Sequence, residues 1–290
     1  MHANNCHLVS FASSDMIKSL QRLERQALGF DFFETLHMYT ENDLDPAFRS
    51  RYSDFITKRS RGYGFWLWKP TIILQALSKI KPNHNLLYID AGCHLNLKGK
   101  SRLSEYFQSL QNSPTGILAF QNKKPVAPLN YDGRKLLDLP DGSWTKGDLL
   151  DYFGVRNDTK ITQTQTIGAG IILIKKIPQA EQFLKSWEMH MRDNIKLLDN
   201  STSVSPNLPG FCEHRHDQSF FSIMAKIEGV PTIAASEYWY PRVDGLKPDW
   251  DALSNFPIHA KRDKEFNYFS KSLIKLRKIW KKLNYRIFGI

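Results

Sequence analysis

A single carboxylate, Asp90, ends the apolar run of residues 86–89 and is followed by Ala91, Gly92 and Cys93. Apolar residues that end in an acid and a turn of small residues indicate a buried parallel strand with Asp90 at its carboxyl end. Open α/β sheets bind their ligands at that edge. A lone acid at a strand end more often caps the next turn, so Asp90 needs partners before it indicates a site.

A second polar group is the segment 213–219, EHRHDQS, in which every residue can hydrogen-bond or titrate. An apolar helix is expected directly after it, and polar groups at a helix N-terminus are frequent in ligand sites. Asp217 and Gln218 are the candidates for catalysis, and His216 is a candidate for substrate binding. Two alternatives stay open: Asp217 as a helix N-cap, and a metal at His214 and His216, whose spacing shares a face only in a strand.

A basic cluster follows at 257–264, PIHAKRDK. A neutral imidazole at His259 can ligate a divalent ion, while Lys261 and Arg262 can neutralise phosphate oxygens. The cluster therefore suits a metal diphosphate. A basic turn that is merely solvated is the alternative.

A fourth segment, 61–70, has the sequence RGYGFWLWKP. Its two glycines allow a close backbone approach, and its aromatic rings can either stack on a ligand or interlock in a core corner. We interpret Phe65 and Trp66 as core residues. Arg61 and Lys69 are the functional candidates.

These segments need a scaffold in which strands alternate with helices. Strands are expected at 7–12, 30–39, 86–90, 116–120 and 167–174, and helices at 16–28, 71–79 and 220–227. This order predicts an α/β fold with a mainly parallel sheet flanked by helices. The polar, turn-rich segment 121–166 is expected to be a long excursion with acceptor contacts, and 199–210 to be a mobile lid or a disordered segment.

Composition limits the function classes. The chain has 290 residues and three cysteines, an odd number with no metal-ligand spacing, which argues against a disulfide framework and favours a reducing compartment. Neither a signal peptide nor an apolar run long enough to cross a membrane is present in the sequence. We therefore expect a cytoplasmic protein.

The net charge of +11 indicates an anionic partner or surface. The excess is concentrated in 265–290, where basic residues alternate with Leu, Ile, Trp and Phe near helical spacing. Such a basic amphipathic helix suits the inner face of the cytoplasmic membrane, or it docks on the protein's own core. Nucleic acid is not an expected partner, because no nucleic-acid-binding motif occurs in the sequence.

Together the segments resemble nucleotide-sugar-dependent glycosyltransferases of the GT-A fold. The closer resemblance is to bacterial surface-polysaccharide (lipopolysaccharide or capsule) glycosyltransferases marked by GYGxWxWKP, DAGC and HRHDQS, which stand here at 62–70, 90–93 and 214–219. This match covers most of 7–264. A fainter similarity to glycosyltransferase family 8 involves 168–174, 217–219 and His259 with Lys261.

The resemblance implies one GT-A-like domain at 1–264 and an added helix at 265–290. It implies transfer of a sugar from a nucleotide diphosphate sugar, with UDP as the expected nucleotide, to a growing surface glycan or a lipid-linked glycan. Retention of the anomeric configuration and a Mn²⁺ or Mg²⁺ cofactor are also expected. The expected donor-binding residues are Ser10, Ala12, Arg61, Lys69, Asp90, Gly92, Lys261 and Arg262. The expected metal ligands are Asp90 and His259. The expected substrate-binding residues are Trp144, Gly168, Ala169, Gly170 and His216.

The chain departs from the GT-A pattern at one point. The usual Asp-x-Asp is replaced by Asp90, Ala91 and Gly92, so one metal ligand is missing. Either His94 or another group substitutes for it, or the basic cluster carries the charge of the leaving group. A non-catalytic, basic membrane- or polyanion-binding protein on the same scaffold is the alternative function.

Overall fold

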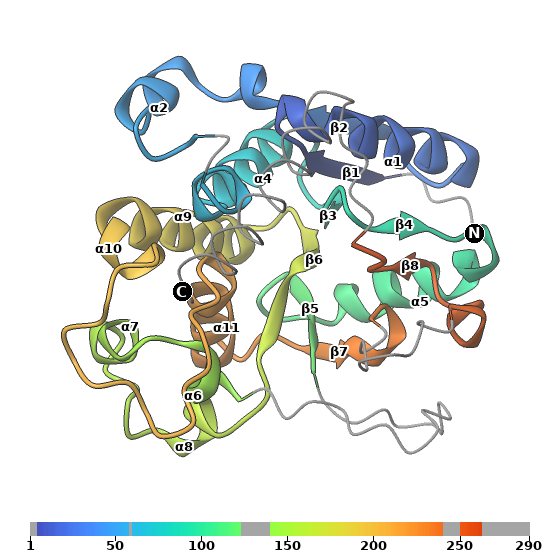
Figure 1. Cartoon of the computed structure of the whole chain (residues 1–290). Helices are drawn as coiled ribbons and strands as arrows, with labels where there is room; N and C mark the ends of the chain where they lie inside the picture. Colours follow the sequence, from blue (N-terminus) through green and yellow to red (C-terminus); the bar gives the residue numbers. More distant parts are fainter. Residues whose placement is uncertain (1–4, 58–59, 123–139, 240–249, 263–290) are drawn as a thin grey trace, which may run out of the picture.

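The computed structural model describes residues 5–57, 60–122, 140–239 and 250–262 (Figure 1). The strands are β1 Cys6–Phe11, β2 Thr35–Tyr39, β3 Asn85–Ile89, β4 His94–Leu95, β5 Ile117–Gln121, β6 Ile167–Lys175, β7 Thr232–Ala234 and β8 Ile258–His259. The helices are α1 Ile17–Phe30, α2 Pro46–Arg51, α3 Gly62–Phe65, α4 Lys69–Ser78, α5 Lys100–Gln111, α6 Asp141–Trp144, α7 Gly147–Tyr152, α8 Thr159–Thr162, α9 Pro178–Asp193, α10 Ile195–Leu198 and α11 Asp217–Ile227. Short 3-10 turns lie at Ser14–Met16, Glu41–Asp43, Leu97–Gly99, Ala235–Glu237 and Asp251–Leu253.

Six strands form one sheet in the order β2-β1-β3-β6-β5-β7, and β4 pairs with β8 in a small second sheet. The pairs β1–β2, β1–β3 and β5–β7 are parallel, whereas β6 runs antiparallel to both β3 and β5. The prediction of a mainly parallel sheet flanked by helices is confirmed. Because β6 runs the other way, its glycine-rich start lies beside the carboxyl end of β3, where the Asp90 N–H donates to the Gly170 carbonyl at 2.9 Å.

Apolar side chains cover both faces of the sheet. In β3, Leu86 and Tyr88 face the core beneath α4, α9 and α11, while Leu87 and Ile89 face the core beneath α1 and α5. All four side chains are fully buried. Burial of such a side chain contributes about 1.5–3 kcal/mol, so this strand is a rigid support for the acid that follows it.

The segment 199–210 is held against α7 by hydrogen bonds. The Asp148 carboxylate accepts from the Val204 and Ser205 N–H groups at 2.9 and 2.7 Å, and the Ser203 hydroxyl accepts from the Asp148 N–H at 2.8 Å. Asn207 accepts from the Gly147 N–H at 2.8 Å. The alternative of a disordered segment is therefore wrong, and the alternative of a mobile lid stays a prediction.

Several predictions fall outside the described residues. The helix expected at 265–290 does, and with it the division of the chain at 264, which stays a prediction. Part of the excursion at 121–166 does as well, and its described part forms α6, α7 and α8. Within the described residues, no helix combines the length and the apolar character needed to span a bilayer.

Candidate active site

A buried lysine joins two acids from distant segments. The Lys69 ammonium lies 2.6 Å from Asp217 Oδ2 and 3.5 Å from Asp90 Oδ1, and it donates to the Ala169 carbonyl at 3.1 Å. The Lys69 and Asp217 side chains are 3% and 5% exposed, whereas the Asp90 side chain is 39% exposed. The fold thus brings four predicted site residues into one polar cluster that opens to solvent at Asp90.

The charges of this cluster support one another. Burial alone would lower the pKa of Lys69, but the carboxylates of Asp217 and Asp90 outweigh burial and raise it. Burial raises the pKa of Asp217 to about 6, an effect that Lys69 opposes and Asp90 reinforces. Lys69 therefore stays charged, and its ammonium is fixed beside the exposed acid.

A hydrogen bond positions the Asp90 carboxylate, and two glycines leave space around it. The Tyr88 hydroxyl donates to Asp90 Oδ1 at 2.6 Å. A Cβ atom at Gly170 would lie 2.8 Å from Asp90 Oδ2, and one at Gly168 would lie 2.8 Å from the Tyr238 hydroxyl. The predicted substrate residues Gly168 and Gly170 thus provide clearance for polar side chains at this edge.

Lys69 follows a backbone segment of unusual conformation. Tyr63, Phe65 and Trp66 have φ values of 53°, 51° and 61°, in the left-handed region that non-glycine residues rarely adopt. A Cβ atom at Gly62 would lie 2.3 Å from the Trp66 ring. Such strain persists only where the surroundings hold it, and it is frequent at functional sites. Here the segment turns the chain sharply into α4, whose first residue is Lys69.

His216 holds this segment against the start of α11. Its ring packs 4.7 Å from the Phe65 ring and 6.0 Å from the Trp66 ring, and Nδ1 lies 2.8 Å from the Leu198 carbonyl. Phe65 and Trp66 pack against the core, as predicted. His216 is 1% exposed, and burial lowers its pKa to about 4. The neutral imidazole thus packs directly before Asp217, and its substrate role stays a prediction.

Three guanidinium groups lie within electrostatic range of one another. Burial lowers the pKa of Arg215, Glu213 opposes the shift, and Arg61 and Arg262 add to it. Glu213 Oε1 lies 3.0 Å from Arg215 Nε and 3.5 Å from Arg61 Nη2. The Arg262 backbone packs against Gly92, 3.6 Å from where a Cβ atom would lie. Among the ion pairs of the described residues, Glu213 is the carboxylate that Arg61 and Arg215 share, so positive charge exceeds negative charge between these two arginines, which suits phosphate.

Sequence reasoning did not single out Arg215. Its guanidinium carbon lies 4.0 Å from the Trp144 ring centroid. The Trp144 carbonyl accepts from the Arg215 N–H at 3.1 Å and from the Ser219 hydroxyl at 2.8 Å. The predicted substrate residue Trp144 therefore belongs to the same surface as EHRHDQS, and it supports an arginine there.

The remaining predicted donor and catalytic residues have different environments. The Ser10 hydroxyl is fully buried and donates to the Ile89 carbonyl at 2.7 Å, and Ala12 is buried as well. Gln218 is half-buried in the first turn of α11, and the Lys261 ammonium lies 5.6 Å from the Trp250 ring centroid. The roles assigned to these four residues stay predictions.

The donor set around Asp90 does not fit the predicted metal pair. His259 Nε2 lies 2.8 Å from the Leu253 carbonyl, and its ring stacks on Trp250. Among the described residues, Asp90 belongs to no cluster of three or more His, Cys, Asp or Glu ligand atoms. The Lys69 ammonium, 3.5 Å from Asp90 Oδ1, would also repel a divalent cation. The positive charges available to a leaving group at this edge are therefore those of the chain's own lysine and arginine residues.

Three solved structures illustrate what the chain is similar to. A glycosyltransferase involved in glycosylation of the major capsid of PBCV-1 is 10% identical, with a TM-score of 0.48 over 88% of this chain and 91% of that one. Mouse xyloside xylosyltransferase 1 is 13% identical, with a TM-score of 0.43 over 88% and 95%. The galactosyltransferase LgtC with donor and acceptor sugar analogs is 10% identical, with a TM-score of 0.39 over 87% and 86%. No protein-family model and no curated protein matches the chain.

Proposed function

We propose that the chain is a glycosyltransferase that moves a sugar from a nucleotide diphosphate sugar to a hydroxyl of an acceptor. The observation that carries the proposal is the buried Lys69, which bridges Asp217 and the solvent-exposed Asp90 at the carboxyl end of β3. The three arginines Arg61, Arg215 and Arg262 add positive charge around this edge of the sheet.

The chemistry requires such a charge distribution. When the bond between the anomeric carbon and the diphosphate oxygen breaks, positive charge develops on the sugar ring and negative charge on the diphosphate. The acceptor oxygen then bonds to the anomeric carbon, and its proton passes to an oxygen of the departing diphosphate. Fixed cations near the diphosphate and fixed carboxylates near the sugar both lower the barrier, because they need no reorganisation during the reaction.

The positive charges of the arginines and of Lys69 can stabilise the negative charge on the departing diphosphate. Guanidinium groups bind phosphate oxygens in pairs, and Arg215 is pre-oriented by its stacking on Trp144. The Lys69 ammonium is held in place by Asp217 and by the Ala169 carbonyl. Donor binding at Arg61 and Arg262 is part of this proposal, whereas Lys69, with a 3% exposed side chain, contributes through its charge, and its predicted contact with the donor stays a prediction.

The two acids have different roles. Asp90 is accessible, so its carboxylate can accept hydrogen bonds from hydroxyls of the ribose or of the transferred sugar. Asp217 is 5% exposed and 2.6 Å from Lys69. We assign it an electrostatic role, in which it keeps Lys69 charged and in place, in preference to the role of a general base.

The finer features of the proposal come from the sequence resemblance. They are UDP as the nucleotide, a growing surface glycan or lipid-linked glycan as the acceptor, and retention of configuration. Attachment of the 265–290 segment to the inner face of the cytoplasmic membrane completes it. The Mn²⁺ or Mg²⁺ cofactor that the resemblance implies is not part of the proposal, because the residues around Asp90 do not fit it. Sugar transfer itself does not depend on any of them.

A turnover experiment tests the proposal. The full chain is incubated with UDP-, GDP-, CMP- and dTDP-sugars, with and without Mn²⁺, and the released nucleotide is measured. We expect turnover with one nucleotide class and its loss in Asp90→Asn, whereas the matched variant Asp193→Asn, an exposed acid at the end of α9, keeps it. Absence of wild-type turnover with every donor would favour the non-catalytic polyanion-binding alternative.

A further inference from the structure

A second polar cluster lies at the opposite edge of the sheet from Asp90. His7 is in the first half of β1, Glu34 directly precedes β2, and His84 directly precedes β3. Because β1 is parallel to both β2 and β3, these three residues meet at the amino-terminal edge of the strands. Asp90 follows the other end of β3, six residues after His84 and roughly 20 Å away at about 3.3 Å per residue. The cluster is therefore separate from the proposed active site.

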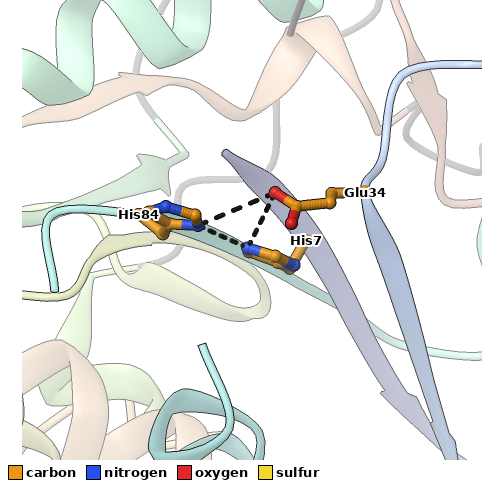
Figure 2. Close-up of side chains that lie close together, drawn as sticks. All are labelled: His7, Glu34 and His84. Carbon is orange, nitrogen blue, oxygen red and sulfur yellow. Dashed lines mark hydrogen bonds and ion pairs between the residues drawn. The ribbon is translucent and has the colours of Figure 1, made fainter. Parts of the chain in front are cut away.

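The three side chains point toward one another (Figure 2). His7 Nε2 lies 2.9 Å from His84 Nδ1, and each of these nitrogens lies 3.8 Å from Glu34 Oε2. A triangle with these sides has a centre about 2 Å from each atom, and zinc binds imidazole nitrogen and carboxylate oxygen at about 2.0–2.2 Å. The triangle thus has the size of a metal-binding site.

Neighbouring residues orient the first imidazole. His7 Nδ1 lies 2.6 Å from the Thr35 hydroxyl oxygen, which lies 3.2 Å from His37 Nε2. These two contacts and the 2.9 Å hydrogen bond between the rings are all satisfied when His7 Nδ1–H donates to Thr35, the Thr35 hydroxyl donates to His37, and His84 Nδ1–H donates to His7 Nε2. A metal ion would displace the His84 Nδ1 proton and bind both ring nitrogens, while Thr35 keeps its hold on His7 Nδ1–H, as is typical of metal-binding histidines.

Among its three described side chains, the cluster is open to solvent at Glu34. The His7 and His84 side chains are 3% and 11% exposed, whereas the Glu34 side chain is 46% exposed. The two imidazoles are therefore fixed by the protein, and the carboxylate lies on the solvent side. Within the described ranges, this is the one group of three or more His, Cys, Asp or Glu side chains whose ligand atoms all lie within 4.8 Å of one another.

We propose that His7, Glu34 and His84 bind a divalent transition metal of the zinc type, with water from the Glu34 side as a fourth ligand. Two imidazoles and one carboxylate suit zinc or cobalt, whereas Mg²⁺ and Ca²⁺ prefer oxygen ligands. The metal links the starts of β1 and β3 to the residue before β2. It therefore stabilises the amino-terminal edge of the sheet and takes no part in sugar transfer.

The test uses the tag-free full chain, stripped with a chelator and then titrated with Co²⁺. We expect the intense visible absorption of four-coordinate Co²⁺ to saturate at one equivalent and to disappear when Zn²⁺ is added. Zn²⁺ should also raise the midpoint of thermal unfolding, because it binds the folded state. Asp90→Asn should leave both signals unchanged, which separates this site from the proposed active site.

Two variants of the ligands decide the assignment. Glu34→Gln keeps the shape of a half-exposed side chain and should weaken Zn²⁺ binding by more than about tenfold, because loss of a residue that only orients a metal ligand already costs about 10- to 100-fold. His84→Gln should abolish the Co²⁺ absorption. The matched control Glu228→Gln, at an exposed acid after α11, should bind like the wild type.

The result that overturns the proposal is a wild-type chain without the Co²⁺ absorption, or one whose absorption persists at unchanged affinity in Glu34→Gln. If His84→Gln fails to fold by circular dichroism, the comparison of Glu34→Gln with Glu228→Gln still decides the question. Sugar transfer plays no part in these readouts, so the proposal can fail or hold independently of the proposed function.

Discussion

The Lys69 ammonium lies 2.6 Å from Asp217 Oδ2, and neither side chain is more than 5% exposed. A buried ion pair of this kind is weak support for stability, because removing two charges from water costs several kcal/mol per ion. Removing one partner costs more, because the other charge is left buried without compensation. A pair that contributes little to folding and yet places a cation 3.5 Å from an exposed acid is better explained by function.

Removal of the lysine charge should therefore damage both folding and activity. Lys69→Met leaves Asp217 buried without its partner, and we expect a loss of about 3–5 kcal/mol in the free energy of unfolding. Chemical denaturation measures this loss. The double variant Lys69→Met with Asp217→Asn should recover most of the stability but none of the turnover. Equal stability of the single and double variants would contradict a coupled pair.

The pH dependence of turnover should follow Asp217. Its pKa is raised to about 6, so below that pH its carboxyl takes up a proton and the attraction that holds Lys69 is lost. We expect the turnover rate at saturating donor to fall about tenfold per pH unit below this value. In Lys69→Arg, which keeps a cation beside Asp217, an acidic limb should remain, whereas Asp217→Asn should remove it.

Acid should lower turnover without destabilising the fold through this carboxyl. The folded-state pKa of Asp217 lies above its ordinary value of 3.8, so the folded state binds the proton more tightly than the unfolded chain does. The stability that this group contributes is complete below pH 3.8 and is lost as pH rises through about 6. Thermal unfolding of the wild type and of Asp217→Asn between pH 4 and 7 checks this. Any loss of stability on acidification should be the same in both proteins or smaller in the wild type.

The sequence was sufficient to predict the strand that ends in Asp90. Its pattern of apolar residues, an acid and small residues has one common structural meaning, and β3 confirms it. The direction of β6 was not predictable, because a run of apolar residues has the same pattern in both orientations. That direction places Gly170 beside Asp90, so the fine geometry of the site depends on information that the strand's own sequence lacks.

The contacts between the residues of the site were harder to predict than the residues themselves. Lys69 and Asp217 were both candidates, but their ion pair joins positions far apart in the chain and depends on how α4 and α11 pack on the sheet. Tyr88 was counted only as an apolar strand residue, although its hydroxyl donates to Asp90. Arg215 stood inside EHRHDQS, and its positive charge was the signal that could have identified it. No pattern in the sequence indicates that His7 and His84 lie close together.

Arg215 should contribute to donor binding more than to folding. Its guanidinium stacks on Trp144 and lies 3.0 Å from Glu213. Hydrogen bonds to charged groups contribute about 1.5–3 kcal/mol, so Arg215→Ala should weaken nucleotide diphosphate binding by roughly 10- to 100-fold in calorimetry. The control is Arg156→Ala. Arg156 lies in the loop after α7 and pairs with Asp151 of that helix. Equal affinities for the two variants would remove Arg215 from the donor site.

A single methyl group at Gly170 should disturb Asp90 without unfolding the protein. A Cβ atom there would lie 2.8 Å from Asp90 Oδ2, so the carboxylate must shift from its contacts with Tyr88 and Lys69. Displacement of a site group by about 1 Å costs about 100-fold in rate, and we expect a loss of that order in Gly170→Ala, measured as kcat/KM. Gly29→Ala on α1 is the matched control, because no atom lies within 4 Å of its added Cβ.

The double variant Gly170→Ala with Asp90→Asn separates this explanation from a general packing defect. If the methyl group acts through the Asp90 carboxylate, the double variant should be no slower than Asp90→Asn alone, because the displaced charge is already absent. If the two losses multiply instead, Gly170 affects turnover by another route, such as direct contact between the β6 backbone and the sugar. Because Gly170→Ala should change the thermal midpoint by only a few degrees, the kinetic comparison is made between folded proteins.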